Sequence, residues 1–447
     1  MGVNRRSFIR YASLAAAGSA AGLRPFGALN SLAQSATDYK ALVCVFLFGG
    51  NDANNTLIPF DTAGYGNYSS IRGPLTLPQS SLIPLAQTQG LYAMNGNLPD
   101  IAKLFDSKAA AMVTNVGTLI APTTKTAYQH GATVPTNLFS HPDQQLEWQN
   151  ASQSGATPTG WAGRIADALT SSYNPGGVVP MITSVAGDTL FCNGAASTPV
   201  SVSPGNLGGA SCSEGTTECT AQQATAQALL QFDSGLSLVQ ADNTITSNAY
   251  NYAKVLTAAT SSLPALQTVF PANNGLAAQL KQIAQVIQAR AALGVSRQIF
   301  FAGIGNFDTH SDQVAQQGTL LAAISPALAA FYQATQELGV ASNVTTFTMS
   351  DFSRTFQPNS NTGSDHAWGS HHIVIGGAVK GGQMYGTFPT LALNGPDDSG
   401  TNGRWVPTTG SVQYAATLAS WFGVSSSQMT TIFPNIGSFP TMNLGFV

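Results

Sequence analysis

The stretch Ala41-Leu42-Val43-Cys44-Val45-Phe46-Leu47-Phe48, followed directly by Gly49-Gly50-Asn51-Asp52, decides the fold of this 447-residue chain. A continuous apolar run of this length, ended by two glycines, predicts a β-strand. Because no polar residue alternates along it, the strand is expected to be covered on both faces, as in the interior of a parallel sheet.

Helical and strand patterns alternate along the rest of the chain. Apolar residues recur at helical spacing from Leu276 to Ala291, with polar residues on the other faces. This alternation predicts an α/β domain with a mainly parallel sheet. The further candidates are strands at 111–115, 298–302, 344–349 and 372–376, and helices at 320–338 and 411–422.

The segment from about 185 to 260 differs from its surroundings. Its first part is rich in Gly, Ser and Thr, lacks periodicity and holds three of the four cysteines. It predicts a loop-rich insertion within a single α/β domain spanning residues 34–447, because no linker elsewhere separates independent domains.

The N-terminus carries a targeting pattern. Asn4-Arg5-Arg6-Ser7-Phe8-Ile9-Arg10 is an arginine pair with a following aromatic residue, and a short Ala- and Gly-rich apolar run leads to a small-residue cleavage site at Ala33. This pattern predicts a twin-arginine signal peptide at residues 1–33, with the export machinery as a partner and a periplasmic or secreted destination. The alternative is an ordinary basic N-terminus on a buried helix. The apolar run is too short to span a membrane, and no other segment is expected to span one.

Composition narrows the function. Charged residues make up only 8% of the chain, whereas apolar residues make up 43%. Without residues 1–33, which hold four arginines, 13 basic residues face 20 acidic ones. No basic patch remains that would indicate a nucleic-acid partner.

The cysteines indicate no metal or redox motif. No CxxC occurs, which argues against a thiolate zinc site. Cys44 lies in the apolar run and is expected to be a buried thiol. In an exported protein, Cys212 and Cys219 could pair.

Four of the six histidines lie between positions 310 and 372, in two carboxylate-rich stretches. The stretches are Phe307-Asp308-Thr309-His310-Ser311-Asp312-Gln313 and Ser364-Asp365-His366-Ala367-Trp368-Gly369-Ser370-His371-His372. Imidazole with carboxylate is a ligand set for zinc, manganese or iron and also serves acid/base catalysis. We therefore predict that the stretches contribute to one site, with a metal as the leading interpretation.

Polar residues also follow several predicted strands. Asp52 follows the first, Asp308 and His310 follow the strand at 298–302, and Asp351 follows the strand at 344–349. Ligands of parallel sheets bind at the carboxyl ends of the strands, so these residues are expected to meet there. The alternative for each aspartate is a turn or cap residue.

A second cluster lies upstream, at Phe139-Ser140-His141-Pro142-Asp143. Ser140 could be a nucleophile activated by a metal or a base, or it could simply cap the following helix. Arg354 could pair with Asp351 or bind an anionic substrate with two hydrogen bonds.

These segments together resemble an exported bacterial family known as domain of unknown function 1501. The resemblance covers nearly the whole chain after residue 33. The blocks that carry it are Phe48 to Thr56, Phe139-Ser140-His141, Gly160-Trp161-Ala162-Gly163-Arg164, Phe307 to His310, Ser350 to Thr355, Asp365-His366 and Gly376 to Gly382.

The family is remotely similar to the alkaline phosphatase and sulfatase superfamily. That similarity implies a three-layer α/β/α sandwich with one or two metal ions at the strand ends. It implies metal ligands at Asp52, Asp308, His310, Asp351 and His366, and a nucleophile near Ser140. Phe352 stands where the superfamily has a histidine ligand.

The leading functional hypothesis is therefore an exported hydrolase of phosphate or sulfate esters that depends on a divalent metal, zinc, manganese or calcium. Ser140 or a water would attack an anionic small-molecule or polymer ester, and Arg354 or Arg164 would bind the anion. The rival is a non-catalytic exported binding protein of the same fold with a degenerate metal site. A third hypothesis is a metal-free serine hydrolase that uses Ser140 and His141. It is the weaker one, because adjacent residues rarely form a nucleophile–base pair.

Overall fold

The predicted apolar strand lies in the middle of the main sheet. The structure is a computed structural model that describes residues 38–151, 157–207, 217–231 and 235–447. Strand β1, Lys40–Leu47, runs parallel to β8, Arg297–Ile304, on one side and to β9, Val344–Ser350, on the other. From Ala41 to Leu47 its residues are at most 5% exposed, as expected for a strand covered on both faces.

The sheet has the order β11-β5-β10-β9-β1-β8-β6-β7, and β12 pairs with β5. Only β10 runs antiparallel to its described neighbours, β5 and β9. The remaining strands are β5, Ala110–Gly117; β6, Ile182–Ser184; β7, Val200–Ser201; β10, Ser370–Ile375; β11, Met384–Tyr385; and β12, Thr409–Gly410. The mainly parallel sheet confirms the predicted α/β fold.

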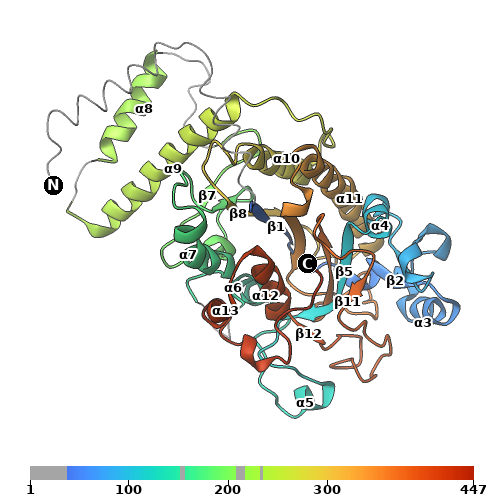
Figure 1. The fold of residues 1–447 in the computed structure, drawn as a ribbon. Coiled ribbons are helices and arrows are strands. Elements are labelled where there is room, and N and C mark those ends of the chain that lie inside the picture. Colours follow the sequence, from blue (N-terminus) through green and yellow to red (C-terminus); the bar gives the residue numbers. More distant parts are fainter. Residues whose placement is uncertain (1–37, 152–156, 208–216, 232–234) are drawn as a thin grey trace, which may run out of the picture. The chain divides into compact units, whose positions relative to one another are not determined.

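Helices cover both faces of this sheet, giving three layers (Figure 1). On one face, α6, His141–Asn150, α7, Trp161–Tyr173, α12, Ser411–Phe422, and α13, Ser426–Ile432, enclose a core that includes Leu42, Cys44 and Phe46 of β1. On the other face lie α4, Pro99–Asp106, α10, Gly275–Gln288, and α11, Gln313–Glu337. The alternation of side chains along β1 lets one strand serve both cores.

Smaller elements surround this framework. A three-stranded antiparallel sheet consists of β2, Leu57–Pro59, β3, Ile83–Pro84, and β4, Tyr92–Met94. Two further helices are α3, Thr62–Arg72, and the short α5, Lys125–Gln129. The segment predicted as an insertion contains β7, α8, Thr217–Leu229, and α9, Ser237–Ser261.

The cysteines divide into two groups. Cys44 and Cys192 are free and buried, and burial raises the pKa of both thiols. Cys219 is disulfide-bonded. Its predicted partner Cys212, like the predicted signal peptide at residues 1–33, lies outside the described residues.

Helix α11 is long and apolar enough, by length and composition, to cross a membrane, contrary to the expectation that no segment beyond the N-terminus would be. It packs against α10 and α4, and its polar residues Gln313, Gln317 and Ser325 are buried. Gln317 donates from Nε2 to the backbone oxygen of Asp52 at 2.8 Å. These contacts are those of a core helix that supports the loop after β1.

Candidate metal centre

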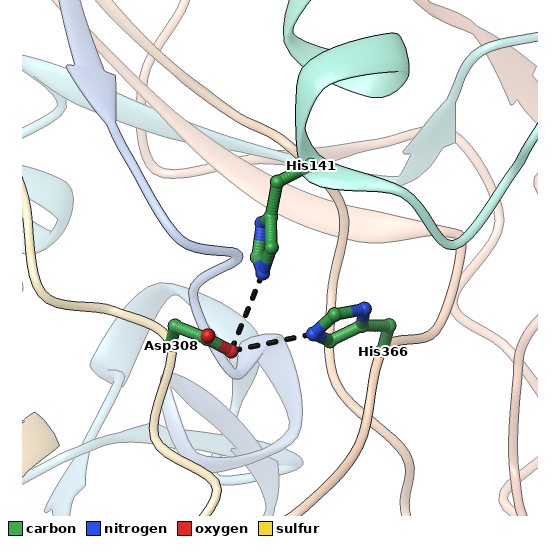
Figure 2. Close-up of side chains that lie close together, drawn as sticks. All are labelled: His141, Asp308 and His366. Carbon is green, nitrogen blue, oxygen red and sulfur yellow. Dashed lines mark hydrogen bonds and ion pairs between the residues drawn. The ribbon is translucent and has the colours of Figure 1, made fainter.

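Three side chains from separate loops meet at the carboxyl edge of the sheet. His141 is the first residue of α6, Asp308 lies in the loop after β8, and His366 lies in the loop before β10. One ligand atom from each lies within 4.8 Å of the others. Oδ1 of Asp308 is 3.3 Å from Nε2 of His141 and 3.3 Å from Nε2 of His366, and Figure 2 shows both rings directed at this carboxylate.

The second nitrogen of each imidazole is held by an acceptor. Nδ1 of His141 is 2.7 Å from Oδ2 of Asp351, and Nδ1 of His366 is 2.7 Å from the backbone oxygen of Phe139. A backbone oxygen only accepts, so Nδ1 of His366 carries a proton. Metal-binding histidines are typically held in this way, with the outer nitrogen donating to a carboxylate or carbonyl.

The protonation of His366 strengthens this interpretation. Burial lowers the pKa of His366, so the ring is neutral near pH 7 and its Nε2 carries a lone pair. That lone pair faces the oxygen of Asp308, which also only accepts. Nε2 of His310 lies 2.9 Å from the same Nε2, so this nitrogen of His366 can accept from His310 or bind a cation that Asp308 shares.

His141 has the opposite shift. Its hydrogen bond to Asp351 raises its pKa, although partial burial acts against this. Oδ2 of Asp351 also accepts from Nε2 of Gln145 at 2.8 Å, and Oδ1 accepts from the backbone N–H of Gly49 at 3.1 Å. Gln145 follows His141 by one helical turn on α6, so the two side chains approach Asp351 from the same face.

His310 lies beside the three-residue group without belonging to it. Its Nε2 is 3.0 Å from Oδ1 of Asp308 and 2.9 Å from Nε2 of His366, and its Nδ1 is 3.2 Å from Oδ1 of Asp365. Nε2 of His310 therefore contacts two members of the three-residue group.

Asp308 is held as a carboxylate by neighbouring positive charge. Partial burial opposes ionisation, but Arg354, His310 and His141 lower the pKa of Asp308 overall. Nη1 of Arg354 is 3.0 Å from Oδ1 of Asp308. The Asp308 side chain remains 44% exposed, so the centre is open to solvent.

Arg354 and Arg164, the predicted anion binders, already have acceptors for every guanidinium nitrogen. Arg354 is buried and donates to the backbone oxygens of Ser364 and Gly49 as well as to Asp308. Arg164 donates to backbone oxygens of Ile432, Thr159 and Asn150. Both side chains connect segments of the fold.

Asp52 lies in a different environment from the three-residue group. Its side chain is buried and forms an ion pair with Arg72, and it accepts from Nε2 of Gln313. Its other oxygen accepts from the backbone and side-chain nitrogens of Asn54 at 3.0 and 3.1 Å. Both oxygens thus have partners within the protein.

Ser140 occupies the N-cap of α6, between the carbonyl that binds His366 and the ring of His141. Its Oγ donates to the carboxylate of Asp143. Phe352 packs against both rings, with centroids 4.8 Å from His141 and 4.7 Å from His366. A hydrophobic ring thereby covers one side of the centre.

His371 and His372 lie in β10 and face away from this chemistry. Nδ1 of His371 accepts from the backbone N–H of Asn115 at 3.0 Å, and His372 packs against Trp148 and Tyr414. Burial lowers the pKa of His371 to about 4 and that of His372 to about 3.

Sequence reasoning assigned no metal-binding role to His141. The signal was present, because His141 stands in the same block as Ser140 and directly precedes a helix. Its position next to Ser140 indicates only a base for that serine, whereas its ring is turned toward Asp351 and Asp308.

The fold and the site define a mixed α/β protein with a candidate metal centre at the carboxyl edge of its main sheet. The chain belongs to the family described as protein of unknown function (DUF1501), whose model matches residues 39–402. No curated protein gives a significant match to this chain.

Several solved structures match over most of the chain at low identity. They include the lipoteichoic acid synthase LtaP from Listeria monocytogenes, with 7% identity, 88% of this chain and 74% of that chain covered, and a TM-score of 0.36. The PsFucS1 sulfatase from Pseudoalteromonas sp. has 11% identity, coverages of 83% and 70%, and a TM-score of 0.31. A mutant of the alkaline phosphatase PafA has 12% identity, coverages of 71% and 63%, and a TM-score of 0.27. With all three TM-scores below 0.5, these matches do not bear on the activity of this chain.

Proposed function

We propose that this protein is an exported, metal-dependent hydrolase of phosphate or sulfate esters. The observation that carries the proposal is the convergence of His141, Asp308 and His366, each imidazole held through its outer nitrogen. Asp308 and His366 are among the residues predicted as ligands, and His141 joins them.

The donor set fits a divalent metal ion. Two imidazole nitrogens and one carboxylate oxygen form the protein part of many catalytic zinc sites, which leave a further position for water or substrate. Ligand atoms about 2.0–2.2 Å from one ion lie roughly 3.3 Å apart in a tetrahedral arrangement. Oδ1 of Asp308 lies 3.3 Å from Nε2 of His141 and 3.3 Å from Nε2 of His366.

In this proposal Asp52 and Asp351 support the centre instead of binding the metal directly. Asp351 orients His141 through Nδ1, and Asp52 anchors the loop after β1 through Arg72 and Gln313. His310 remains a candidate ligand because its Nε2 contacts two members of the group.

A bound divalent ion would act as a Lewis acid toward the ester oxygen. Ser140 is the proposed nucleophile, and Asp143 accepts its hydrogen bond and would take its proton. The serine oxygen would bond to phosphorus or sulfur as the alcohol leaves with a proton. Water would then hydrolyse the serine ester and release the inorganic anion.

The proposal is tested with the exported, never-denatured full chain. Elemental analysis should find about one divalent metal per chain, since a specific site fills under metal-replete conditions. The metal-loaded protein should hydrolyse an aryl phosphate or an aryl sulfate. A stoichiometry below about 0.2 under those conditions, or no turnover on either ester, would exclude the hydrolase and favour the non-catalytic binding protein.

Ser140→Ala separates the two possible nucleophiles. If Ser140 attacks, the variant should lose about a thousandfold or more in rate while losing only about 1 kcal/mol of stability with its hydrogen bond to Asp143. Activity within about tenfold of the wild type would assign the attack to water, a loss in the range of ordinary positioning effects.

Export is part of the proposal and rests on the Arg5-Arg6 pattern. The disulfide at Cys219 supports it, because disulfides persist mainly outside the cytoplasm. Replacing both arginines with lysine should retain the protein in the cytoplasm, as seen by cell fractionation. Unchanged export of this variant would contradict the twin-arginine route.

A further inference from the structure

Arg404 lies on the two residues that hold one edge of the candidate centre. Its Nε donates to the backbone oxygen of His366 at 2.9 Å, and its guanidinium lies over the ring of Phe139, 4.3 Å from the centroid. Phe139 in turn accepts the Nδ1 proton of His366. Arg404 therefore contacts the centre through the backbone of His366 and through Phe139, which holds the His366 ring.

The remaining donors of Arg404 are free within the described part of the chain. No described residue accepts from its Nη1 or Nη2, and the side chain is partly exposed. The contrast is with Arg354 and Arg164, whose nitrogens donate to carbonyl and carboxylate oxygens. Arg404 thus offers a guanidinium edge where those two cannot.

The loop that carries Arg404 is rigidly anchored by Asp398. The carboxylate of Asp398 is buried, and its Oδ1 accepts from the backbone N–H groups of Gly400 and Arg404 at 3.0 Å each. Its Oδ2 accepts from the backbone N–H groups of Asn394 at 2.9 Å and Gly403 at 3.0 Å. Four such bonds satisfy the buried charge and fix the backbone from which Arg404 projects.

We propose that Arg404 is the substrate-binding cation of this site, gripping the tetrahedral oxyanion of a phosphate or sulfate ester. The proposal rests on the hydrolase function above and deepens it. A planar guanidinium offers two parallel donors to such an oxyanion, and stacking on Phe139 with Nε already engaged reduces the entropy lost on binding. Arg404 would act together with the metal centre, from the side of His366.

The test measures binding of inorganic phosphate and of inorganic sulfate to the metal-loaded full chain by calorimetry. The variants are Arg404→Ala and Arg404→Lys, which retains the charge but lacks the fork. The matched control is Lys125→Ala. Lys125 donates to the backbone and side-chain oxygens of Asn394 and to the backbone oxygen of Gly395, so it braces the same loop without contacting His366 or Phe139.

We expect the dissociation constant of the preferred anion to rise about tenfold or more in Arg404→Ala, because a hydrogen-bonded charge contact is lost. Arg404→Lys should fall between this variant and the wild type, and Lys125→Ala should match the wild type within about twofold. Metal content should remain at the wild-type value in all three. Preference for phosphate or for sulfate would name the ester class.

Other outcomes separate the two proposals. Wild-type protein that binds metal and an anion, with unchanged affinity in Arg404→Ala, overturns the role of Arg404 and leaves the hydrolase intact. Equal weakening in Lys125→Ala assigns the effect to the loop and also overturns it. Metal-loaded wild type that binds neither anion removes the oxyanion site altogether, whereas wild type that takes up no metal removes the hydrolase itself.

Discussion

Asp52 and Asp308 both lie in loops that leave the carboxyl edge of the sheet, but their carboxylates have opposite surroundings. The Asp52 cluster, Asp52 with Arg72, Asn54 and Gln313, is buried and gives each carboxylate oxygen a donor. The Asp308 cluster, Asp308 with His141 and His366, is partly exposed and sets an acceptor oxygen against imidazole nitrogens.

This difference in burial and in surrounding donors is the reason that we assign a structural role to Asp52 and a ligand role to Asp308. A buried charge is stable when protein donors satisfy it, and an ion would have to displace a donor such as Arg72 to bind Asp52. Oδ1 of Asp308 accepts from Arg354, but the side chain is partly exposed and the same oxygen faces Nε2 of His141 and of His366, so an ion from solvent can reach it. On the proposed function, the same residue type at the same edge of the sheet therefore supports the fold at Asp52 and binds the metal at Asp308.

The largest expected effect comes from Asp308→Asn. The amide keeps the shape and can still accept from Arg354, but it removes the negative charge that would bind the metal. Metal affinity should fall by more than the roughly 10–100-fold typical of outer-layer changes, and ester hydrolysis should fall with it. Titration with metal under a competing chelator measures the affinity.

Asp312→Asn is the matched control for this change. Asp312 lies in the same stretch but is exposed, and Asn tolerates its positive φ of 44° well. Its metal affinity should equal that of the wild type. If the two variants behave alike, Asp308 is not a ligand and the contrast between the clusters disappears.

The Asp52 cluster should respond in stability instead. Asp52→Asn leaves the buried charge of Arg72 without its partner, so the free energy of unfolding should fall by about 3–5 kcal/mol. Chemical denaturation of the metal-free protein measures this change. The exposed cap residue Asp61 provides the control, since Asn caps a helix as well as Asp and Asp61→Asn should change stability by less than about 0.5 kcal/mol.

The same variant also tests the prediction that Asp52 binds the metal directly. A folded Asp52→Asn protein of normal stability that no longer binds metal would restore Asp52 as a ligand. It would then follow that the ion pair with Arg72 rearranges when metal binds.

The sequence predicts which residues lie at this edge of the sheet, but not which of the two aspartates is buried and paired. Apolar runs mark where strands end, so the residues at the carboxyl edge could be named from the sequence, including Asp52, Asp308 and His366. The sequence does not indicate which carboxylate meets a buried arginine. Arg72 reaches Asp52 from the end of α3, twenty positions away and outside any recognised block.

The role of His141 and the direction of β10 were also beyond sequence reasoning. The sequence does not indicate which way the ring of His141 turns. The packing of α6 against β9 and the loop after it brings Asp351 to Nδ1 of His141. The run at 372–376 was correctly predicted as a strand, but its antiparallel pairing depends on how the chain returns from His366. That return places His366 before the strand, at the same edge as Asp308.

Asp351 contacts a proposed ligand without being one itself, so Asp351→Asn should lower metal affinity less than Asp308→Asn does. Asp351→Asn replaces the carboxylate that holds Nδ1 of His141 with a neutral amide that has one acceptor oxygen instead of two, and it changes no proposed ligand, so metal affinity should weaken by about 10–100-fold with full stoichiometry at high metal. Gln145→Ala, which loses only the donor to Asp351, should weaken it less. A complete loss of metal at saturating concentration in Asp351→Asn would make Asp351 a ligand itself.

The smallest expected effect concerns His372. Like the Asp52 cluster, this buried histidine is expected to contribute to the stability of the fold and not to metal binding. The pKa of His372 is lowered from 6.5 to about 3 by burial, so the unfolded chain binds a proton below pH 6.5 that the folded protein excludes. The stability gained from a neutral His372 is thus fully present above pH 6.5 and is lost as pH falls toward 3. At pH 5, 1.5 units below the unfolded value, the loss is about 2 kcal/mol.

His372→Phe keeps an aromatic ring against Trp148 and Tyr414 and removes this titration. Between pH 7 and pH 5 the metal-free wild type should therefore lose about 2 kcal/mol more unfolding free energy than the variant. The exposed His130 supplies the control, and His130→Gln should follow the wild-type profile. Parallel profiles for wild type and His372→Phe would mean that water or a proton reaches His372 in the folded state. The contrast between buried structural residues and the partly exposed metal centre would then not apply to His372 in β10.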